Sequence, residues 1–183
     1  MSALLILLAI VVLVALALGL LYNNLVKLRN RIEGAWAQID VQLKRRYDLI
    51  PNLVETVKGY ASHEKETLDA VIRARNAAGA ASGPADQAQA ENMITSALRQ
   101  VFALSEAYPD LKANQGFLQL QEELAGTEGR ISYARQFYND TVLRYNTKIQ
   151  TFPTVVIANA MQFKEREYFE ADDASRGPVQ VQL

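Results

Sequence analysis

The chain has 183 residues, 50% of them hydrophobic, and its 19 basic and 20 acidic residues give a formal net charge of -1. Such a chain suits one domain with an appendage, and it lacks the cationic field of nucleic-acid-binding proteins, so no nucleic-acid partner is expected. Without cysteine it forms no disulfide, thiolate metal site, catalytic thiol or lipoprotein-type anchor. Few glycines and prolines, with abundant Ala, Leu, Gln and Glu, predict an all-helical fold.

The N-terminal residues form an uncharged apolar segment. Residues 3–22 are mainly Leu, Ile, Val and Ala, and about 20 such residues cross a hydrocarbon core of roughly 30 Å as a helix. A cleaved signal peptide is the alternative, because Ala15-Leu16-Ala17 resembles a small-residue cleavage site. The lack of a preceding basic segment and the apolar residues after Ala17 favour a permanent single-pass anchor at residues 1–24.

Basic residues follow the apolar segment closely on one side. Lys27, Arg29 and Arg31 predict a cytoplasmic body with the N-terminus outside, because positive flanks stay in the cytoplasm. They are also candidate contacts for anionic lipid headgroups, each contributing on the order of 1 kcal/mol. A solvated helix face that only sets the topology is an equally weighted alternative. The more distant run Lys44-Arg45-Arg46 is expected to be exposed to solvent.

A long amphipathic helix is predicted from about residue 22 to residue 76. Apolar residues recur every three or four positions with one wider gap, and polar residues occupy the opposite face. Pro51 predicts a kink near residues 47–51, because its ring removes one backbone hydrogen bond. Gly34 and Gly59 weaken a helix, which indicates either that the helix tolerates the loss of stability or that a neighbour approaches closely at these positions. The residues predicted to lie in the core or at an interface are Leu25, Leu28, Ile32, Trp36 and Ile39.

Three further helices are predicted after a loop around Gly79. One spans residues 84–107, with Pro84 in its first turn, and another spans residues 114–150. Gly126 and Gly129 in the latter are expected to let a neighbouring helix approach closely. Pro153 starts a short helix that ends at residue 163.

Together these elements predict an N-terminal transmembrane helix that continues into an antiparallel bundle of about four long helices. The bundle occupies residues 25–170, packs in a coiled-coil-like manner, and holds Trp36, Ile39, Leu124, Ile131 and Tyr138 inside. Residues 171–183 are expected to form an extended polar tail. Draping of this tail over the bundle is favoured over pairing with another chain.

Catalytic chemistry has little support in the sequence. His63 is the single histidine and lies on a charged helical face, so neither a catalytic triad nor a multi-histidine metal site can be built. Gly126-Thr127-Glu128-Gly129 is too short for a phosphate-binding loop. Acidic residues interleaved with lysine and glutamine are usually solvated rather than catalytic, and this applies to Glu64, Glu66, Glu122, Glu123 and Glu128. No enzyme activity, cofactor or metal ligand is therefore predicted.

Several sequence runs resemble the bacterial LemA family. They are Leu25-Val26-Lys27-Leu28-Arg29-Asn30, the run from Ala35 to Val54, Ala134-Arg135-Gln136-Phe137-Tyr138-Asn139-Asp140, Tyr145-Asn146, Phe152-Pro153 and Glu167-Tyr168-Phe169. The resemblance covers nearly the whole chain. It implies a single-pass protein of the bacterial inner membrane with an antiparallel bundle of about four helices and no assigned enzyme activity.

Two functions fit these observations. The first is a membrane-anchored, non-enzymatic scaffold that self-associates and organises or remodels the membrane, with lipids and further copies of the chain as partners. The alternative is an adaptor or regulator of a membrane protease or signalling protein. Self-association is expected because the long first helix is apolar over more turns than the shorter helices can cover, notably around Leu25, Leu28 and Ile32.

Overall fold

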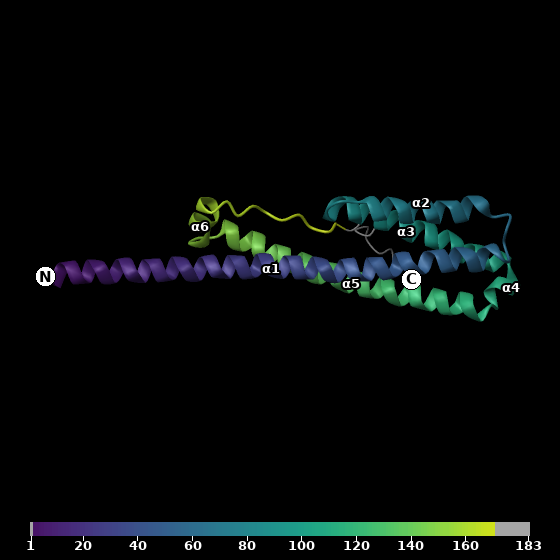
Figure 1. The fold of residues 1–183 in the computed structure, drawn as a ribbon, viewed down its shortest axis with the longest axis horizontal. Coiled ribbons are helices and arrows are strands. Elements are labelled where there is room, and N and C mark those ends of the chain that lie inside the picture. Colours follow the sequence, from purple (N-terminus) through teal and green to yellow (C-terminus); the bar gives the residue numbers. More distant parts are fainter. Residues whose placement is uncertain (1, 171–183) are drawn as a thin grey trace, which may run out of the picture. The chain divides into compact units, whose positions relative to one another are not determined.

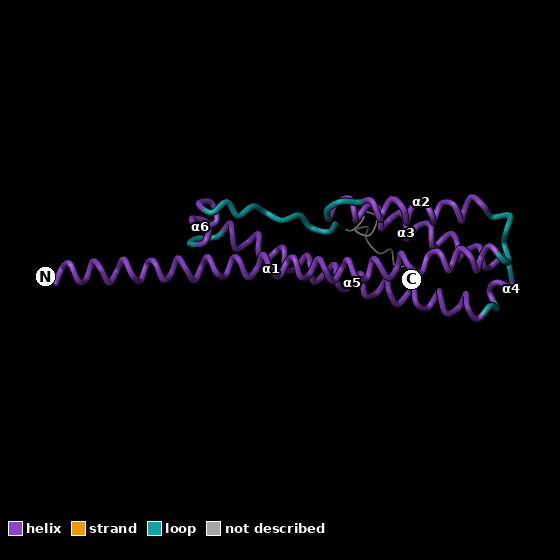
Figure 2. Tube along the Cα trace, in the orientation of Figure 1, coloured by secondary structure: helices purple, strands orange, loops and turns teal. Residues whose placement is uncertain are grey.

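The computed structural model describes residues 2–170, and 85% of those residues are helical, with no strand among them. The helices are α1 Ser2–Lys58, α2 Lys65–Ala80, α3 Pro84–Leu104, the short 3-10 helix η1 Ser105–Ala107, α4 Pro109–Lys112, α5 Gln115–Gln150 and α6 Thr154–Ala160 (Figures 1 and 2). The all-helical prediction is confirmed. The predicted tail at residues 171–183 lies outside the described residues.

The chain divides into two compact units, and α1 and α5 each contribute to both. Unit 1 combines the part of α1 up to Ala37 with Gln136–Glu167, and unit 2 combines Gln38–Arg135 with the described residues 168–170. The domain boundary predicted after residue 24 lies within unit 1, inside an unbroken helix. The apolar N-terminal segment is therefore joined directly to folded structure.

The prediction of one helix from residue 22 to residue 76 is wrong, because α1 ends at Lys58 and α2 begins at Lys65. The amides of Tyr60 and Ala61 both donate to the Val57 carbonyl, at 3.0 and 2.8 Å, and close the last turn of α1. Gly59, a poor helix former, stands at the break, and the widest gap in the apolar pattern follows it. Pro51 itself lies within α1.

The other helix termini follow local sequence signals. α3 begins at Pro84 after Gly83, whose φ of 88° favours glycine. The amide of Phe117 donates to the Asn114 side-chain oxygen at 2.9 Å, which caps the start of α5. α3 stops at Leu104 and continues as η1, which ends at the predicted residue 107. The predicted end of α6 is less accurate, because α6 stops at Ala160 rather than at residue 163.

The core of unit 2 is drawn from α1, α2, α3, α4 and the first half of α5. Figure 1 shows α2 and α3 lying side by side, joined by the short loop Ala81–Gly83. The rings of Phe102 and Phe117 meet edge to face with their centroids 6.2 Å apart. Fully buried members of this core include Ile50, Leu53, Val57, Val71, Ile94, Val101 and Leu111.

Unit 1 has a smaller core supplied by α1, the end of α5, and α6. Its buried apolar residues include Leu25, Ile32, Ala35, Val142, Tyr145, Ile149, Ile157 and Ala158. On α1 these positions continue the three- and four-residue spacing that predicted an amphipathic face. Helical periodicity therefore located most of the buried face of α1, although it placed Trp36 rather than Ala35 inside.

The close helix approach expected at Gly126 and Gly129 is wrong, and of the two alternatives at Gly34 and Gly59 the structure favours tolerance. No described atom outside the local helix lies within 4 Å of a Cβ placed at Gly34, Gly126 or Gly129. A Cβ at Gly59 meets only the carbonyl oxygens of the turn before it, the nearest at 3.5 Å. Gly34, Gly126 and Gly129 therefore weaken their helices without serving a close contact.

Candidate functional site

The first feature that suggests a function is the exposed apolar start of α1. Residues 2–20 are all exposed, and α1 is, within residues 2–170, the helix long and apolar enough to cross a membrane. Exposed apolar side chains on every face of a helix are stable in lipid rather than in water. This segment is a candidate membrane anchor, as the sequence analysis predicted.

Aromatic and basic side chains surround α1 directly after this segment. The ring of Tyr22 meets the ring of Phe163 edge to face, with centroids 5.9 Å apart. The guanidinium of Arg29 lies 5.8 Å from the centre of the same Phe163 ring, and that of Arg31 lies 5.5 Å from the centre of the Phe137 ring. Such pairs are cation–π contacts, so two of the three candidate headgroup contacts also pack on the protein itself. Lys27 is exposed.

The five residues predicted for the core or an interface divide into two groups. Leu25, Ile32 and Ile39 are buried, whereas Leu28 and Trp36 are partly buried. Leu25 and Ile32 are therefore covered within one chain, and the uncovered apolar surface expected around them is absent. The prediction failed because it did not foresee that the end of α5 and α6 would fold against this part of α1 in unit 1.

Trp36 was predicted inside the bundle and is only partly covered. Its ring meets the buried Tyr138 ring edge to face at a centroid distance of 5.5 Å. Ile39, Leu124, Ile131 and Tyr138 are buried as predicted.

Residues 163–167, an irregular segment after α6, are bound to α5 by side chain–backbone hydrogen bonds. The hydroxyl of Tyr145 donates to the Lys164 carbonyl at 3.0 Å, and that of Tyr138 donates to the Glu167 carbonyl at 2.9 Å. The spacing of Tyr138 and Tyr145 places both on one face of α5. Burial raises the pKa of both phenols, so both remain protonated donors at neutral pH.

A second constellation is a buried ionic network in unit 2. Arg46 on α1 is only 3% exposed, and its Nη1 lies 3.0 Å from Glu91 Oε2 on α3 and 2.9 Å from Glu128 Oε2 on α5. Its Nη2 donates to the Thr95 hydroxyl at 2.8 Å. The hydroxyl of Tyr47 donates to Glu91 Oε1. One guanidinium thus connects three helices.

The electrostatics of this network are dominated by burial. Burial raises the pKa of the Glu91 carboxyl, and the hydrogen bond from Tyr47 and the charge of Arg46 oppose that rise. Burial also raises the pKa of the Tyr47 phenol, so that it stays a donor to Glu91. Removing one partner of such a buried pair leaves an uncompensated charge, which is strongly destabilising.

The prediction that Arg46 is solvent-exposed is wrong. Arg46 lies three residues after buried Leu43 and four before buried Ile50, so it occupies the apolar stripe of α1. That spacing was the signal in the sequence. The charge run Lys44-Arg45-Arg46 concealed it, because such runs are usually solvated.

The sequence matches a known protein family over most of its length. A model of the LemA family matches residues 35–183, which is most of the chain and excludes the apolar start of α1. The chain belongs to the LemA family.

Individual relatives match a similar share of the chain. The chain is 29% identical to Protein LemA of Metamycoplasma hominis over 161 residues, covering 86% of this chain and 72% of the relative. It is 23% identical to Magnetosome protein MamQ 2 of Paramagnetospirillum magneticum and 24% identical to Magnetosome protein MamQ of Magnetospirillum gryphiswaldense, each over 184 residues. Those two alignments cover 86% of this chain and 68% of the relative.

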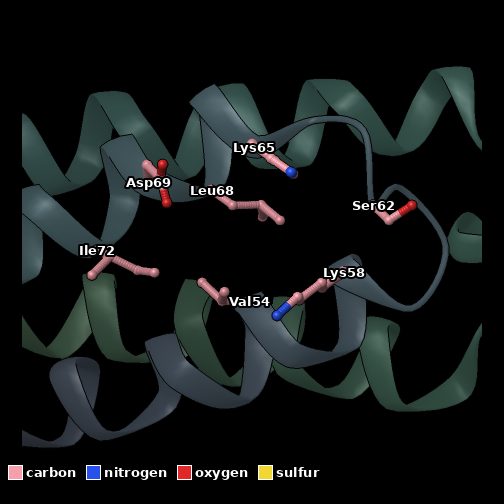
Figure 3. Close-up of a pocket in the computed structure, with 7 residues that line it drawn as sticks. All are labelled: Val54, Lys58, Ser62, Lys65, Leu68, Asp69 and Ile72. Carbon is pink, nitrogen blue, oxygen red and sulfur yellow. The ribbon is translucent and has the colours of Figure 1, made fainter.

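This LemA-family chain also has a small surface pocket in unit 2, between the end of α1 and the start of α2. Its volume is about 230 Å³, and Figure 3 shows Val54 and Leu68 facing each other across it. The remaining lining residues are Lys58, Ser62, Lys65, Asp69 and Ile72. The pocket combines an apolar floor with two ammonium groups, one hydroxyl and one carboxylate. His63 is exposed and is absent from this lining.

Proposed function

We propose that this LemA-family protein is a membrane-anchored, non-enzymatic scaffold that self-associates and organises or remodels the membrane around its anchor. The observation that carries the proposal is the continuity of α1. One helix runs from Ser2 to Lys58, and its first buried residue, Leu25, follows the uncharged segment without a linker. A continuous helix transmits tilt and rotation between a span and the body attached to it, which a flexible linker would not do.

The membrane assignment includes an orientation. Lys27, Arg29 and Arg31 follow the apolar segment, which supports a bacterial inner-membrane protein with its N-terminus outside and its body in the cytoplasm. The same residues are proposed to contact anionic headgroups, in addition to the cation–π contacts of Arg29 and Arg31.

Uncovered apolar surface around Leu25 and Ile32 does not support self-association, because both residues are covered within the chain. The support comes instead from the span. The exposed span is the surface through which copies would meet, since anchoring in one plane raises their effective concentration. The antiparallel arrangement of the long helices is part of this proposal. The short α2–α3 connection Ala81–Gly83 supports it, because short loops place successive helices antiparallel.

The mass of the detergent-solubilised full-length chain at micromolar concentration tests the proposal, together with the shape of liposomes that contain it. We expect a particle that holds two or more 20.4 kDa chains and liposomes whose shape changes with protein density. A strictly monomeric chain that leaves liposomes unchanged would contradict the scaffold.

In that case the adaptor role takes its place. The pocket between α1 and α2 favours this second function, because a mixed apolar and charged depression suits a peptide side chain of a membrane-protein partner. Co-purification of the monomer with one such protein, lost on Leu68→Glu, would support it.

A further inference from the structure

We propose that α6 and the turns directly before and after it form a second membrane contact, in which Phe152, Val156 and Met161 dip into the lipid headgroup region beside the anchor. We call these three residues the α6 tip. The proposal rests on membrane anchoring through α1 and adds a specific lipid-binding surface of the folded body.

The α6 tip consists of three large apolar side chains that are exposed. Phe152 is 84% exposed, and Val156 and Met161 are each 60% exposed. Single exposed apolar side chains are ordinary on soluble proteins, whereas a group of large ones marks an interaction surface. Thr154, Ile157 and Ala158 are buried, so α6 is held in place. Val156 on α6 remains exposed, as do Phe152 before it and Met161 after it.

The α6 tip lies beside the end of the apolar segment of α1, and this position points to the membrane as the partner that covers it. The ring of Phe163, two residues after Met161, packs against the ring of Tyr22 within unit 1. Tyr22 stands at the end of the apolar segment, where tyrosine commonly marks the boundary between lipid and water. Figure 1 shows α6 at the end of α5 beside this part of α1. Because α1 is continuous, an anchor that spans the bilayer holds α6 at the bilayer surface.

Charges around the α6 tip complement an anionic membrane surface. Arg29 lies over the Phe163 ring, Lys164 follows it and is exposed, and Lys27 is exposed on the adjacent part of α1. Apolar side chains flanked by lysine and arginine are typical of protein surfaces that lie about 5–10 Å deep in the headgroup region. The partner that fits this combination is an anionic bilayer rather than a purely apolar groove.

Site-directed fluorescence in the full-length chain tests the proposal, and the lack of native cysteine makes single labelling sites clean. Val156→Cys and Met161→Cys variants carry an environment-sensitive fluorophore and are reconstituted into vesicles of phosphatidylethanolamine and phosphatidylglycerol. Some vesicles also contain lipids with a nitroxide quencher in the headgroup region. Leu143→Cys, 54% exposed on α5 in unit 1, and Val41→Cys, 62% exposed on α1, are the matched controls.

We expect the quencher lipids to lower fluorescence at residues 156 and 161 by about twofold or more, and to leave residues 41 and 143 nearly unchanged. Val156→Asp added to Met161→Cys should reduce that quenching, because a carboxylate resists entry into an anionic interface. Flotation of each variant with the vesicles reports the anchor separately.

Flotation without preferential quenching at residues 156 and 161 overturns the α6 contact and leaves the anchor intact. Failure to float overturns both proposals. Fluorescence at residue 156 that is unaffected by the quencher lipids but changes with protein density would show that the α6 tip contacts a second copy of the chain. That result also overturns the lipid contact.

Discussion

Asn146 holds Arg166 through two hydrogen bonds to its backbone. The side-chain Nδ2 of Asn146 donates to the Arg166 carbonyl at 2.9 Å, and the Arg166 amide donates to Asn146 Oδ1 at 2.9 Å. A side-chain amide that engages both backbone groups of one residue replaces the partner that a neighbouring strand would supply. Asn146 thereby satisfies a backbone segment that has no helix or strand of its own.

Asn146→Ala is expected to lower the free energy of unfolding by about 1–3 kcal/mol, because it removes a buried side chain and leaves the part-buried backbone groups of Arg166 without their partner. Denaturant unfolding of the detergent-solubilised chain measures the loss. Asn159→Ala, at an exposed position on α6, is the control and should change stability by less than about 0.5 kcal/mol. Equal small effects at both positions would show that residues 163–167 are held by other contacts.

Removal of the Arg46 charge should be far more damaging than removal of the neighbouring Arg45 charge. Arg46→Met leaves Glu91 buried without its cation, which costs about 3–5 kcal/mol. Arg45 is half exposed and lies 3.9 Å from Glu123, so Arg45→Met should cost less than about 1 kcal/mol. Comparable losses in denaturant unfolding would mean that the network contributes no more than a surface ion pair.

The Arg46→Met defect should depend on pH. Burial already raises the pKa of the Glu91 carboxyl, and loss of Arg46 removes an interaction that opposes the rise. An acid with a raised folded-state pKa binds protons more strongly in the native state, so stability falls as pH rises above the ordinary glutamate pKa. The variant should therefore be closer to wild type at about pH 5 than at about pH 8. Glu128, Tyr47 and Arg135 surround the same carboxyl and are unchanged in this comparison.

Two glycine substitutions should change stability in opposite directions. Gly129→Ala adds a methyl group within α5, where no described neighbour would meet it, and should stabilise the fold by up to about 1 kcal/mol. Gly83→Ala forces a side chain onto φ 88° and ψ 167°, a conformation nearly restricted to glycine, and should cost about 1–3 kcal/mol. Thermal unfolding of the two variants under one condition gives the comparison. A destabilised Gly129→Ala would indicate that a further partner approaches this face of α5.

Sequence periodicity predicted most of the buried face but not the partner that buries it. Leu25 and Ile32 were recognised as apolar positions on one side of a helix, yet their cover comes from residues more than a hundred positions later. The break at Gly59 was also missed, since the apolar spacing on either side suits one helix or two. Periodicity reports which side of a helix is buried, whereas the chain reversal depends on tertiary packing.

Only those parts of the candidate site that follow from amino-acid composition, the anchor and its basic flank, could be predicted from the sequence. An uncharged apolar segment identifies an anchor, and a basic flank suggests headgroup contacts. The role of Asn146 was not derivable, because its partner Arg166 lies in an irregular segment without a periodic signal. The resemblance drew attention to Tyr145-Asn146, and the structure supplies the reason: both side chains bind the backbone of residues 164–166.

The orientation of the anchor can be tested with two single-cysteine variants, since the chain has no native cysteine. Lys27, Arg29 and Arg31 predict a cytoplasmic body, because basic residues beside a span are retained on the cytoplasmic side. Ser82→Cys, in the exposed loop between α2 and α3, should therefore resist a membrane-impermeant thiol reagent in intact bacterial cells and react after permeabilisation. Ser2→Cys, at the other end of the span, should react in intact cells. The reverse pattern would place the body outside, and would move the proposed contacts of the basic residues and the α6 tip to the opposite leaflet.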